Sequence, residues 1–344
     1  MQLPREVVVG NGVIERVTDV TERLGFAESA LIVAGPKTFN IAGRVVKEFL
    51  EYKGIEVDKF LVESATSEDM RAVEDRIKSL KPQVIFAVGG GTKIDVAKLS
   101  SAHQKIPFIS VPTTASHDGI SSPLSSIKSL DKPYSVMAQA PIAIIADTKT
   151  IVKAPWRHAI SGCGDVIAKF TAVKDWRLAH EDRKEYHGEY AASLALMSAK
   201  LVMQNAQAIK TREEDGLRVL IEALISCGVS MSIAGSSRPC SGSEHLFSHA
   251  LDIIKPNHAM HGERCGVGAI MMAYLHKTDW KRIRKTLLLL GAPTKASELG
   301  VERDDVIEAL QTSSTIRPER YTILNKLCLS RKDCKDLASA TKVI

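Results

Sequence analysis

Short apolar runs alternate with longer stretches of helical periodicity between residues 30 and 147, and this alternation constrains the fold more than any other feature. Runs rich in β-branched residues predict strands, and apolar residues spaced three and four apart predict amphipathic helices. Strands that alternate with helices are typical of a parallel sheet built from βαβ units. The sequence therefore predicts a Rossmann-like α/β domain. The predicted strands are residues 30–34, 57–62, 84–88, 108–111 and 142–146, and the predicted helices are residues 39–52, 67–80 and 94–102.

The pattern changes at about residue 153, after which the chain reads as helical throughout. Leu, Ala, Met and Glu dominate the apolar-periodic segments there, and no comparable strand run follows. We therefore expect an α/β domain over residues 1–152 that binds a dinucleotide, and an all-helical domain over residues 153–344 that binds a metal and the substrate. The predicted helices of the second domain are residues 188–210, 215–231, 266–274, 280–290 and 303–311.

Composition excludes several classes of protein. The 344 residues are 44% hydrophobic with a net charge of +6, as in an ordinary globular chain, and the cations are scattered, so no nucleic-acid partner is expected. The six cysteines form no CxxC pair and the N-terminus lacks a secretory pattern, which indicates a cytoplasmic protein. No apolar run approaches the roughly 20 residues that cross a bilayer, so stable membrane insertion is not expected.

Two polar loops follow predicted strands, where an open parallel sheet binds ligands. Gly89-Gly90-Gly91 follows the most apolar strand and opens a helix, so its backbone can approach a dinucleotide pyrophosphate closely. Neither GxGxxG nor GxxxxGK[ST] is present, and a tight turn without a ligand is the alternative. Residues 112–118 supply further hydroxyl groups after the next strand. Two such loops in one sheet favour a nucleotide.

Three segments of the second half carry residues of the kinds that bind metals. Residues 161–165 open a predicted helical segment and end in Asp165, and His245 and His261 lie in glycine-flanked segments further on. One carboxylate and two imidazoles with a fourth position open are typical of catalytic zinc. Each residue could instead cap a helix or lie at the surface. Nearby cysteines are rival ligands that we interpret as buried packing residues, namely Cys163, Cys240 and Cys265.

These motifs, in this order and spacing, resemble the archaeal sn-glycerol-1-phosphate dehydrogenases, a group within the iron/zinc polyol dehydrogenase family that shares its fold with dehydroquinate synthase. The resemblance covers nearly the whole chain. The segments that carry it are GGGTKID (89–95), PTTASHDG (112–119), GCGD (162–165), GSEH (242–245) and HAMHG (258–262).

The resemblance implies NAD(P)H-dependent reduction of dihydroxyacetone phosphate to sn-glycerol-1-phosphate for archaeal ether phospholipids, in a homo-oligomer with one zinc ion per subunit. It implies that Asp165, His245 and His261 bind zinc, and that Asp118, Asp165 and His249 contact the substrate. Asp118 and His249 are the candidate catalytic residues for proton transfer. The implied dinucleotide contacts are Gly89, Gly90, Gly91, Thr92, Lys93, Ile94, Asp95, Thr113, Thr114, Ala115, Ser116 and Ser122.

Two basic residues bear on cofactor specificity and on binding of the substrate phosphate. Lys37 lies in the turn that follows the first predicted strand. An acidic residue at this place would bind the ribose hydroxyls of NAD, whereas a lysine tolerates the 2′-phosphate of NADPH. Arg264 is a candidate for the substrate phosphate, with ion pairing as its alternative role. The competing functions are a glycerol dehydrogenase, a dehydroquinate synthase-like lyase, whose first metal ligand is normally Glu, and a nucleotide sensor without catalysis.

Overall fold

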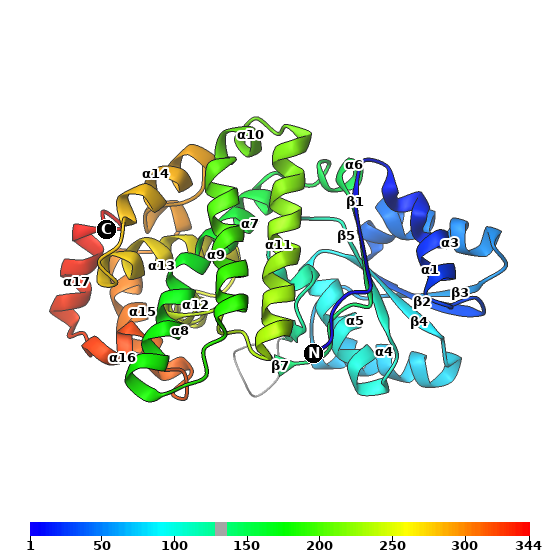
Figure 1. Cartoon of the computed structure of the whole chain (residues 1–344), viewed down its shortest axis with the longest axis horizontal. Coiled ribbons are helices and arrows are strands. Elements are labelled where there is room, and N and C mark those ends of the chain that lie inside the picture. The colour runs from blue at the N-terminus through cyan, green and yellow to red at the C-terminus, as the bar shows by residue number, and fades with distance from the viewer. Residues whose placement is uncertain (128–135) are drawn as a thin grey trace. The chain divides into compact units, whose positions relative to one another are not determined.

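The N-terminal unit of the chain, Met1–Trp156, is built on a six-stranded parallel sheet in the computed structural model, which describes residues 1–127 and 136–344 (Figure 1). The strand order is β1-β8-β5-β4-β2-β3, and every neighbouring pair is parallel. The strands are β1 (Glu6–Gly10), β2 (Ser29–Ala34), β3 (Glu56–Leu61), β4 (Val84–Gly89), β5 (Phe108–Pro112) and β8 (Ala143–Asp147), with a small antiparallel pair, β6 (Leu124–Ser125) and β7 (Val136–Met137).

Short helices connect these strands. They are η1 (Val13–Arg16), α1 (Val17–Arg23), α2 (Pro36–Thr38), η2 (Phe39–Gly43), α3 (Arg44–Tyr52), α4 (Ser67–Leu80), α5 (Gly91–Gln104), η3 (Asp118–Ile120) and α6 (Thr148–Ile151). The parallel α/β fold class is therefore confirmed, and the five predicted strands match β2, β3, β4, β5 and β8 to within a residue at each end.

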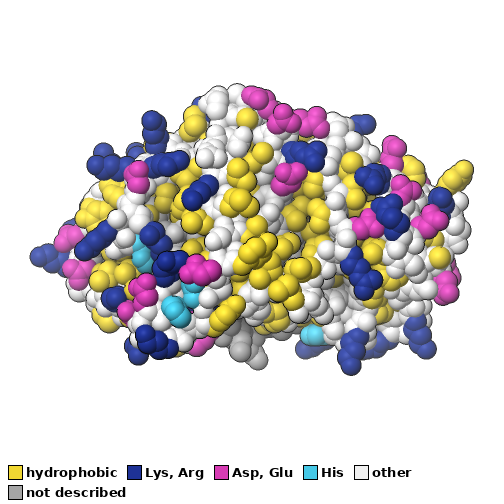
Figure 2. Space-filling view, in the orientation of Figure 1, with side chains coloured by type: hydrophobic (Ala, Val, Ile, Leu, Met, Phe, Trp, Pro, Cys, Tyr) yellow, Lys and Arg dark blue, Asp and Glu magenta, His cyan; other side chains and the backbone are white. Residues whose placement is uncertain are grey.

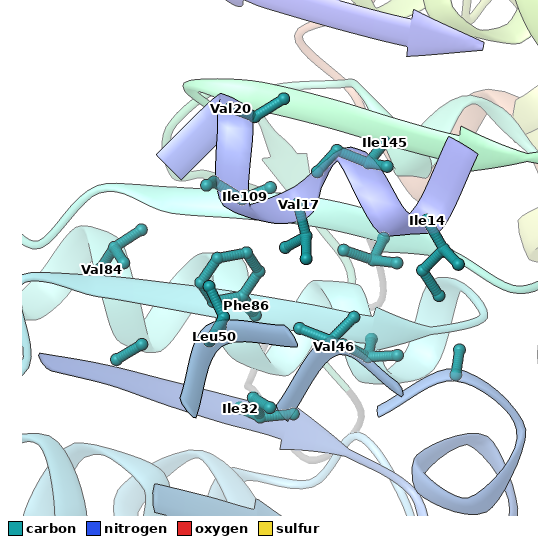
Figure 3. Close-up of a cluster of buried hydrophobic side chains, with 14 of the residues drawn as sticks. Ile14, Val17, Val20, Ile32, Val46, Leu50, Val84, Phe86, Ile109 and Ile145 are labelled. Carbon is teal, nitrogen blue, oxygen red and sulfur yellow. The ribbon is translucent and has the colours of Figure 1, made fainter. Parts of the chain in front are cut away.

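Alternation along the central strands builds the core of this unit. Successive side chains of a strand point to opposite faces, so Ile32, Phe86 and Ile109 come to lie on one face of the sheet. Apolar residues of η1, α1 and α3 pack against that face, among them Val17 and Leu50 (Figure 3). Every residue of β4, β5 and β8 is buried, as expected for strands covered on both faces.

The order of the strands reverses at β2, which lies between β3 and β4. Ligands bind at such a switch point, beyond the carboxyl ends of the strands. Ala34 of β2 pairs with Val88 of β4, and Gly89 of β4 pairs with Pro112 of β5, so the turns after all three strands share one edge of the sheet. The polar loops that the sequence singled out are therefore neighbours.

The second unit, Arg157–Ile344, contains no strand, and the structure describes all of its residues. This confirms the helical class predicted for the second half. Its helices are α7 (Arg157–Ile167), α8 (Lys169–Arg183), α9 (Glu189–Gln204), α10 (Ala206–Lys210), α11 (Glu214–Ala234), α12 (Ser243–Ile254), α13 (His261–Leu275), α14 (Trp280–Leu290), η4 (Ser297–Leu299), α15 (Arg303–Ile316), α16 (Ile323–Leu327) and α17 (Arg331–Ala340).

Helix α11 is long and apolar enough to cross a bilayer, although no uninterrupted apolar run of the chain approaches that length. It has 21 residues and a mean hydropathy of 1.7 in its most apolar window, because a few polar residues interrupt the apolar run without ending the helix. The same window is 61% buried within the structure, as in the core helix of a globular unit. It packs along α9 (Figure 1).

Helix α7 begins before the position that the sequence predicts. The pattern suggests a helix that opens within residues 161–165, but α7 starts at Arg157 and Asp165 lies in its last turn. Gly162 and Gly164 lower the intrinsic helix propensity of this segment, which hides the helix from pattern reasoning. Helix α7 packs closely against α13, and this close approach accounts for the glycine at position 164.

Candidate active site

The candidate site residues fall into two groups, one in each unit. In the N-terminal unit, β4 ends at Gly89 and α5 begins at Gly91, so the glycine turn delivers the chain to a helix N-terminus, which attracts anions. A Cβ atom on Gly91 would lie 1.9 Å from Nε2 of His117. Any side chain at position 91 would therefore have to displace the imidazole of the neighbouring loop.

Thr114 supplies the observation that points to a ligand at this turn. Its Oγ1 is buried and has no hydrogen-bond partner among the described residues. A Cβ atom on Gly90 would lie 3.1 Å from that oxygen, so the hydroxyl adjoins the turn. Buried hydroxyl groups normally have partners. An unsatisfied hydroxyl beside a helix N-terminus fits the phosphate or ribose of a dinucleotide.

Lys98 ties α5 to the neighbouring loops. Its ammonium is fully buried and donates to the Asp95 carboxylate at 3.1 Å, to the Gly119 carbonyl at 2.9 Å and to the Leu124 carbonyl at 2.6 Å. The other Asp95 oxygen accepts from the Ser126 amide at 3.2 Å. Asp95, an expected dinucleotide contact, therefore already anchors the loops through both carboxylate oxygens.

The remaining predicted dinucleotide residues surround the same carboxyl edge of the sheet. Lys37 is exposed in α2, directly after β2. The side chain of Ile94 is fully buried in the core, so it faces away from solvent. The other predicted contacts occupy the first turn of α5 and the loop that follows β5, namely Thr92, Lys93, Thr113, Ala115, Ser116 and Ser122, with Asp118 at the start of η3.

In the helical unit, the three predicted metal ligands converge. Donor atoms of Asp165 in α7, His245 in α12, and His261 and Cys265 in α13 all lie within 4.8 Å of one another. Nε2 of His245 is 3.4 Å from Oδ1 of Asp165, and the two imidazole centroids are 5.0 Å apart. One carboxylate and two imidazoles gathered in a buried cluster fit a divalent metal such as zinc.

Backbone contact between α7 and α13 brings Asp165 to His261. A Cβ atom on Gly262 would lie 1.8 Å from the Ser161 carbonyl oxygen, and one on Gly164 would lie 2.2 Å from the Gly262 carbonyl oxygen. Only glycine at both positions allows the helices to approach this closely. The glycines that flank the predicted ligands are therefore packing residues that set the position of the donors.

A buried carboxylate orients one of the imidazoles. Nδ1 of His245 lies 2.8 Å from Oε1 of Glu244, which is fully buried. The Gly242 amide and the Thr171 hydroxyl donate to the two oxygens of the same carboxylate, each at 2.7 Å. Because Nδ1 donates to Glu244, Nε2 faces Asp165 and is free to bind a metal. Metal-binding histidines usually donate their second ring nitrogen to a carboxylate in this way.

Electrostatics keep Asp165 ionised. Burial alone would raise the pKa of its carboxyl, but Lys169, whose Nζ is 2.8 Å from Oδ1, and then His245 and His261 hold this pKa well below its usual range. Lys169 is fully buried, so its charge acts at low screening. A carboxylate that stays ionised is the form that binds metal ions.

The two imidazoles are shifted in opposite directions. Burial would lower the pKa of His245, but Cys265, Asp165 and Glu244 outweigh it and raise this pKa well above its usual value. Burial, and then the charge of His245, lower the pKa of His261 well below its usual range. His261 is therefore neutral and able to ligate, whereas a metal must displace a proton from His245.

His249 lies one turn after His245 on α12, with its ring centroid 5.9 Å from that of His261. Burial, followed by the charges of His245, Arg264, Arg317 and Arg320, lowers the pKa of His249 to about 3. Three guanidinium groups thus contribute positive potential beside the metal cluster, although Arg264 is paired with Asp252 and Arg317 with Glu319. Sequence reasoning missed Arg317 and Arg320, which lie after α15 with no motif to mark them.

Arg264, the expected candidate for the substrate phosphate, takes part in helix packing. Its NH1 is 2.7 Å from an Asp252 carboxylate oxygen and donates to the Ala259 carbonyl at 2.7 Å. Its Nε donates to the Ser248 hydroxyl at 3.2 Å. The guanidinium therefore links α12 to the start of α13, which is the ion-pairing role that the sequence left open.

The three cysteines that the sequence offers as rival ligands differ in their distance from the metal donors. Cys163 is buried in α7, and burial raises the pKa of its thiol above the usual range. Cys240 is also buried, with its Sγ 3.3 Å from the Ser230 hydroxyl. Cys265 is buried as expected, but its Sγ also belongs to the donor cluster. The pattern HxxxC, which places two side chains on one face of a helix, was the available signal.

A surface cavity of about 440 Å³ elsewhere in the helical unit is lined by Trp280, Lys281, Arg284, Lys285, Leu288, Ala340 and Lys342. Figure 2 shows Lys and Arg side chains gathered over α14 in this region. The cavity contains none of the metal donors and no acidic side chain. The buried donor cluster, rather than this surface cavity, carries the chemistry expected of the active site.

Comparison with known proteins identifies relatives over the whole chain. Residues 8–155 match the family model of iron-containing alcohol dehydrogenases. The chain is 51% identical over 344 residues to glycerol-1-phosphate dehydrogenase [NAD(P)+] of Pyrococcus furiosus, covering 100% of this chain and 99% of that one. It is also 51% identical to the enzyme of the same name from Methanosarcina mazei, covering 100% and 96%. Glycerol dehydrogenase from Schizosaccharomyces pombe has the same fold, with a TM-score of 0.82, 21% identity, and coverage of 99% and 89%.

Proposed function

Because this chain belongs to the glycerol-1-phosphate dehydrogenase family, we propose that it is an NAD(P)H-dependent oxidoreductase that reduces dihydroxyacetone phosphate to sn-glycerol-1-phosphate for archaeal ether phospholipids. The observation that carries the proposal is the convergence of Asp165, His245 and His261 within 4.8 Å in a buried cluster. A dehydroquinate synthase-like lyase or a nucleotide sensor has less support, because the full-length relatives are dehydrogenases by name.

In this proposal, Asp165, His245 and His261 hold one zinc ion per subunit, and the loops after β4 and β5 hold the dinucleotide. When bound, the metal polarises the substrate carbonyl and the dinucleotide supplies the hydride. Glu244 keeps Nε2 of His245 turned toward the ion, and Lys169 keeps Asp165 ionised. The chain itself thus provides orientation and charge rather than a nucleophile.

The positive potential around His249 supports a phosphorylated substrate. Arg264, Arg317 and Arg320 all act on this imidazole, and an anionic phosphate group would be stabilised in the same field. Because its pKa lies near 3, His249 is neutral at physiological pH. A neutral imidazole can accept a proton at one ring nitrogen and donate from the other, so His249 is our candidate for a proton relay, with Asp118 as the second candidate.

An NADPH- and NADH-oxidation assay with dihydroxyacetone phosphate tests the function. We expect turnover that disappears on chelation and returns with zinc, and chiral analysis that identifies only sn-glycerol-1-phosphate. Unphosphorylated dihydroxyacetone is the control, because a plain glycerol dehydrogenase would reduce it equally well. Turnover of both ketones at equal rates, or turnover that survives chelation, contradicts the proposal.

Lys37 is expected to let the enzyme accept NADPH alongside NADH. Replacement Lys37→Glu is expected to lower kcat/KM for NADPH about tenfold, or about 1.4 kcal/mol, and to leave NADH within about threefold. Lys53→Glu, at an exposed lysine beyond the C-terminal end of α3, is the matched control. A wild-type enzyme that uses only NADH contradicts this assignment.

We also propose a cytoplasmic homo-oligomer. All six cysteines are free thiols, which agrees with a reducing compartment. Tyr190, Met197 and Leu201 recur along one face of α9 and are 73%, 50% and 41% exposed. Figure 2 shows hydrophobic side chains gathered over this helix. A contiguous exposed apolar stripe is typical of a protein interface, and a second copy of the chain is the proposed partner.

A further inference from the structure

We propose that Cys265 is a fourth protein ligand of the metal in the substrate-free enzyme. The inference rests on the metal centre of the proposed function and extends it, because the resemblance assigns only Asp165, His245 and His261. Cys265 lies one turn after His261 on α13, and side chains four residues apart share a helix face. Its sulfur completes a cluster of four donor atoms that all lie within 4.8 Å of one another.

Two of the separations between donor atoms match the spacing expected around one zinc ion. Sγ of Cys265 is 3.5 Å from Nε2 of His261, and Nε2 of His245 is 3.4 Å from Oδ1 of Asp165. Tetrahedral zinc with bonds of about 2.3 Å to sulfur and about 2.0 Å to nitrogen and oxygen requires edges of about 3.3 to 3.6 Å. Both pairs are already at the spacing that a shared ion demands.

The surroundings of the sulfur favour a ligand over a packing residue. Cys265 is fully buried, and its Sγ contacts the imidazole nitrogens of His261, at 4.0 Å and 3.5 Å. By contrast, Sγ of Cys240 contacts the Ser230 hydroxyl and the Cys227 carbonyl. Cys163, although only two residues from Asp165, is not a member of the donor cluster. Of the three buried cysteines near these motifs, only Cys265 faces the metal donors.

A thiolate ligand has two chemical consequences. Binding of a divalent ion releases the Cys265 proton to solvent, so the ligand set becomes carboxylate, thiolate and two neutral imidazoles. Sulfur is a soft donor, which favours zinc over magnesium or manganese. Such a ligand set would hold the ion through four protein donors in the substrate-free enzyme.

Cobalt substitution of the full-length enzyme tests the ligand directly. Chelated protein is reloaded with one equivalent of Co²⁺, and its absorption spectrum is recorded without substrate. We expect an intense near-ultraviolet thiolate-to-cobalt charge-transfer band in the wild-type protein. X-ray absorption of the zinc form is expected to show one sulfur neighbour at about 2.3 Å. Because both measurements use the wild-type chain, they do not depend on whether a variant folds.

Two substitutions complete the test. Cys265→Ser is expected to abolish the charge-transfer band and to weaken metal binding at least about tenfold in competition with a chelator. Cys334→Ser makes the same change at a buried cysteine of α17 that belongs to no group of potential metal donors among the described residues, and it is expected to keep both properties. Stoichiometric cobalt without the band in the wild-type protein overturns Cys265 as a ligand and leaves the three-residue centre intact. Failure to bind cobalt at all overturns the centre itself.

Discussion

His261 is the residue through which the metal centre can be separated from the rest of the enzyme. His261→Ala removes a donor from the buried cluster of the helical unit, whereas the loops predicted to bind the dinucleotide belong to the N-terminal unit. We expect the variant to lose its metal and its turnover while its dissociation constant for NADH stays within about twofold of wild type. Elemental analysis and fluorescence titration measure the two properties.

The neighbouring His258 provides the control for this prediction. It lies in the same segment, with its Nδ1 against the Lys255 carbonyl, and is not a member of the donor cluster. His258→Ala is expected to retain the metal. Equal loss of metal in both variants would indicate that the segment had misfolded and that His261 has no special role.

Acid is expected to destabilise the protein through His249. The pKa of His249 is about 3 in the folded protein and near 6.5 in the unfolded chain. Between these two pH values the imidazole is protonated in the unfolded chain and neutral in the folded protein. Stability from this group is complete above pH 6.5 and falls as the pH drops. Between pH 7 and pH 5 the loss is about 2 kcal/mol. Urea unfolding of the metal-free protein at both values measures it.

The variant His249→Gln isolates this contribution, because glutamine does not titrate. Wild type is expected to lose about 2 kcal/mol more than the variant on acidification, whereas the other histidines act equally in both proteins. Parallel losses in the two proteins would mean that His249 is protonated with an ordinary pKa in the folded state.

Single residues also mark the limit of what the sequence reveals about the site. Asp165, His245 and His261 could be chosen because their residue types and flanking glycines are visible in the sequence. Cys265 was read as a packing residue because burial and ligation leave the same local pattern. Arg317 and Arg320 carry no motif, and only the folding of distant segments brings their charges to His249.

At the scale of elements, the contact between α7 and α13 makes a sharp prediction. Gly262→Ala would place a Cβ atom 1.8 Å from the Ser161 carbonyl oxygen, so the helices must separate. We expect a loss of about 1 to 3 kcal/mol in stability and weaker metal binding, because Asp165 and His261 move apart. Thermal unfolding and chelator competition measure the two effects.

Gly266, one turn further along α13, is the matched position. A Cβ atom there would meet its nearest neighbours at 3.4 Å, which is ordinary contact. Gly266→Ala is expected to keep metal affinity and to gain up to about 1 kcal/mol from helix propensity. If both alanines behave alike, close helix approach does not set the geometry of the donors.

The elements that sequence reasoning missed share a cause. Strand β1 lies at the edge of the sheet and pairs only with β8, more than a hundred residues away, and only Val8 of its residues is buried, so no fully buried run marks it. Helix α8 contains many charged residues and shows no clear apolar period, and two glycines lower the helix propensity of α7. Strands such as β4 could be predicted because burial on both faces requires a continuous run of apolar residues or Gly, which is visible in the sequence.

At the scale of the whole molecule, the exposed stripe of α9 predicts self-association. Met197 lies at its centre, 50% exposed, so Met197→Glu would place a charge in the proposed interface. We expect the wild-type protein to be oligomeric and the variant to be monomeric, as measured by size-exclusion chromatography with light scattering. The control is Leu288→Glu, an apolar residue of similar exposure on α14. A monomeric wild-type protein contradicts the prediction.

The meeting of α7 and α13 through their main chains has a consequence for how the enzyme acquires its ion. Peptide groups in contact leave little freedom for the helices to shift, so the donors are arranged before any cation arrives. Ion capture then demands little reorganisation, unlike in small zinc domains that are unfolded without metal. The apoenzyme is therefore a rigid receptor, and its circular dichroism spectrum should barely change during uptake.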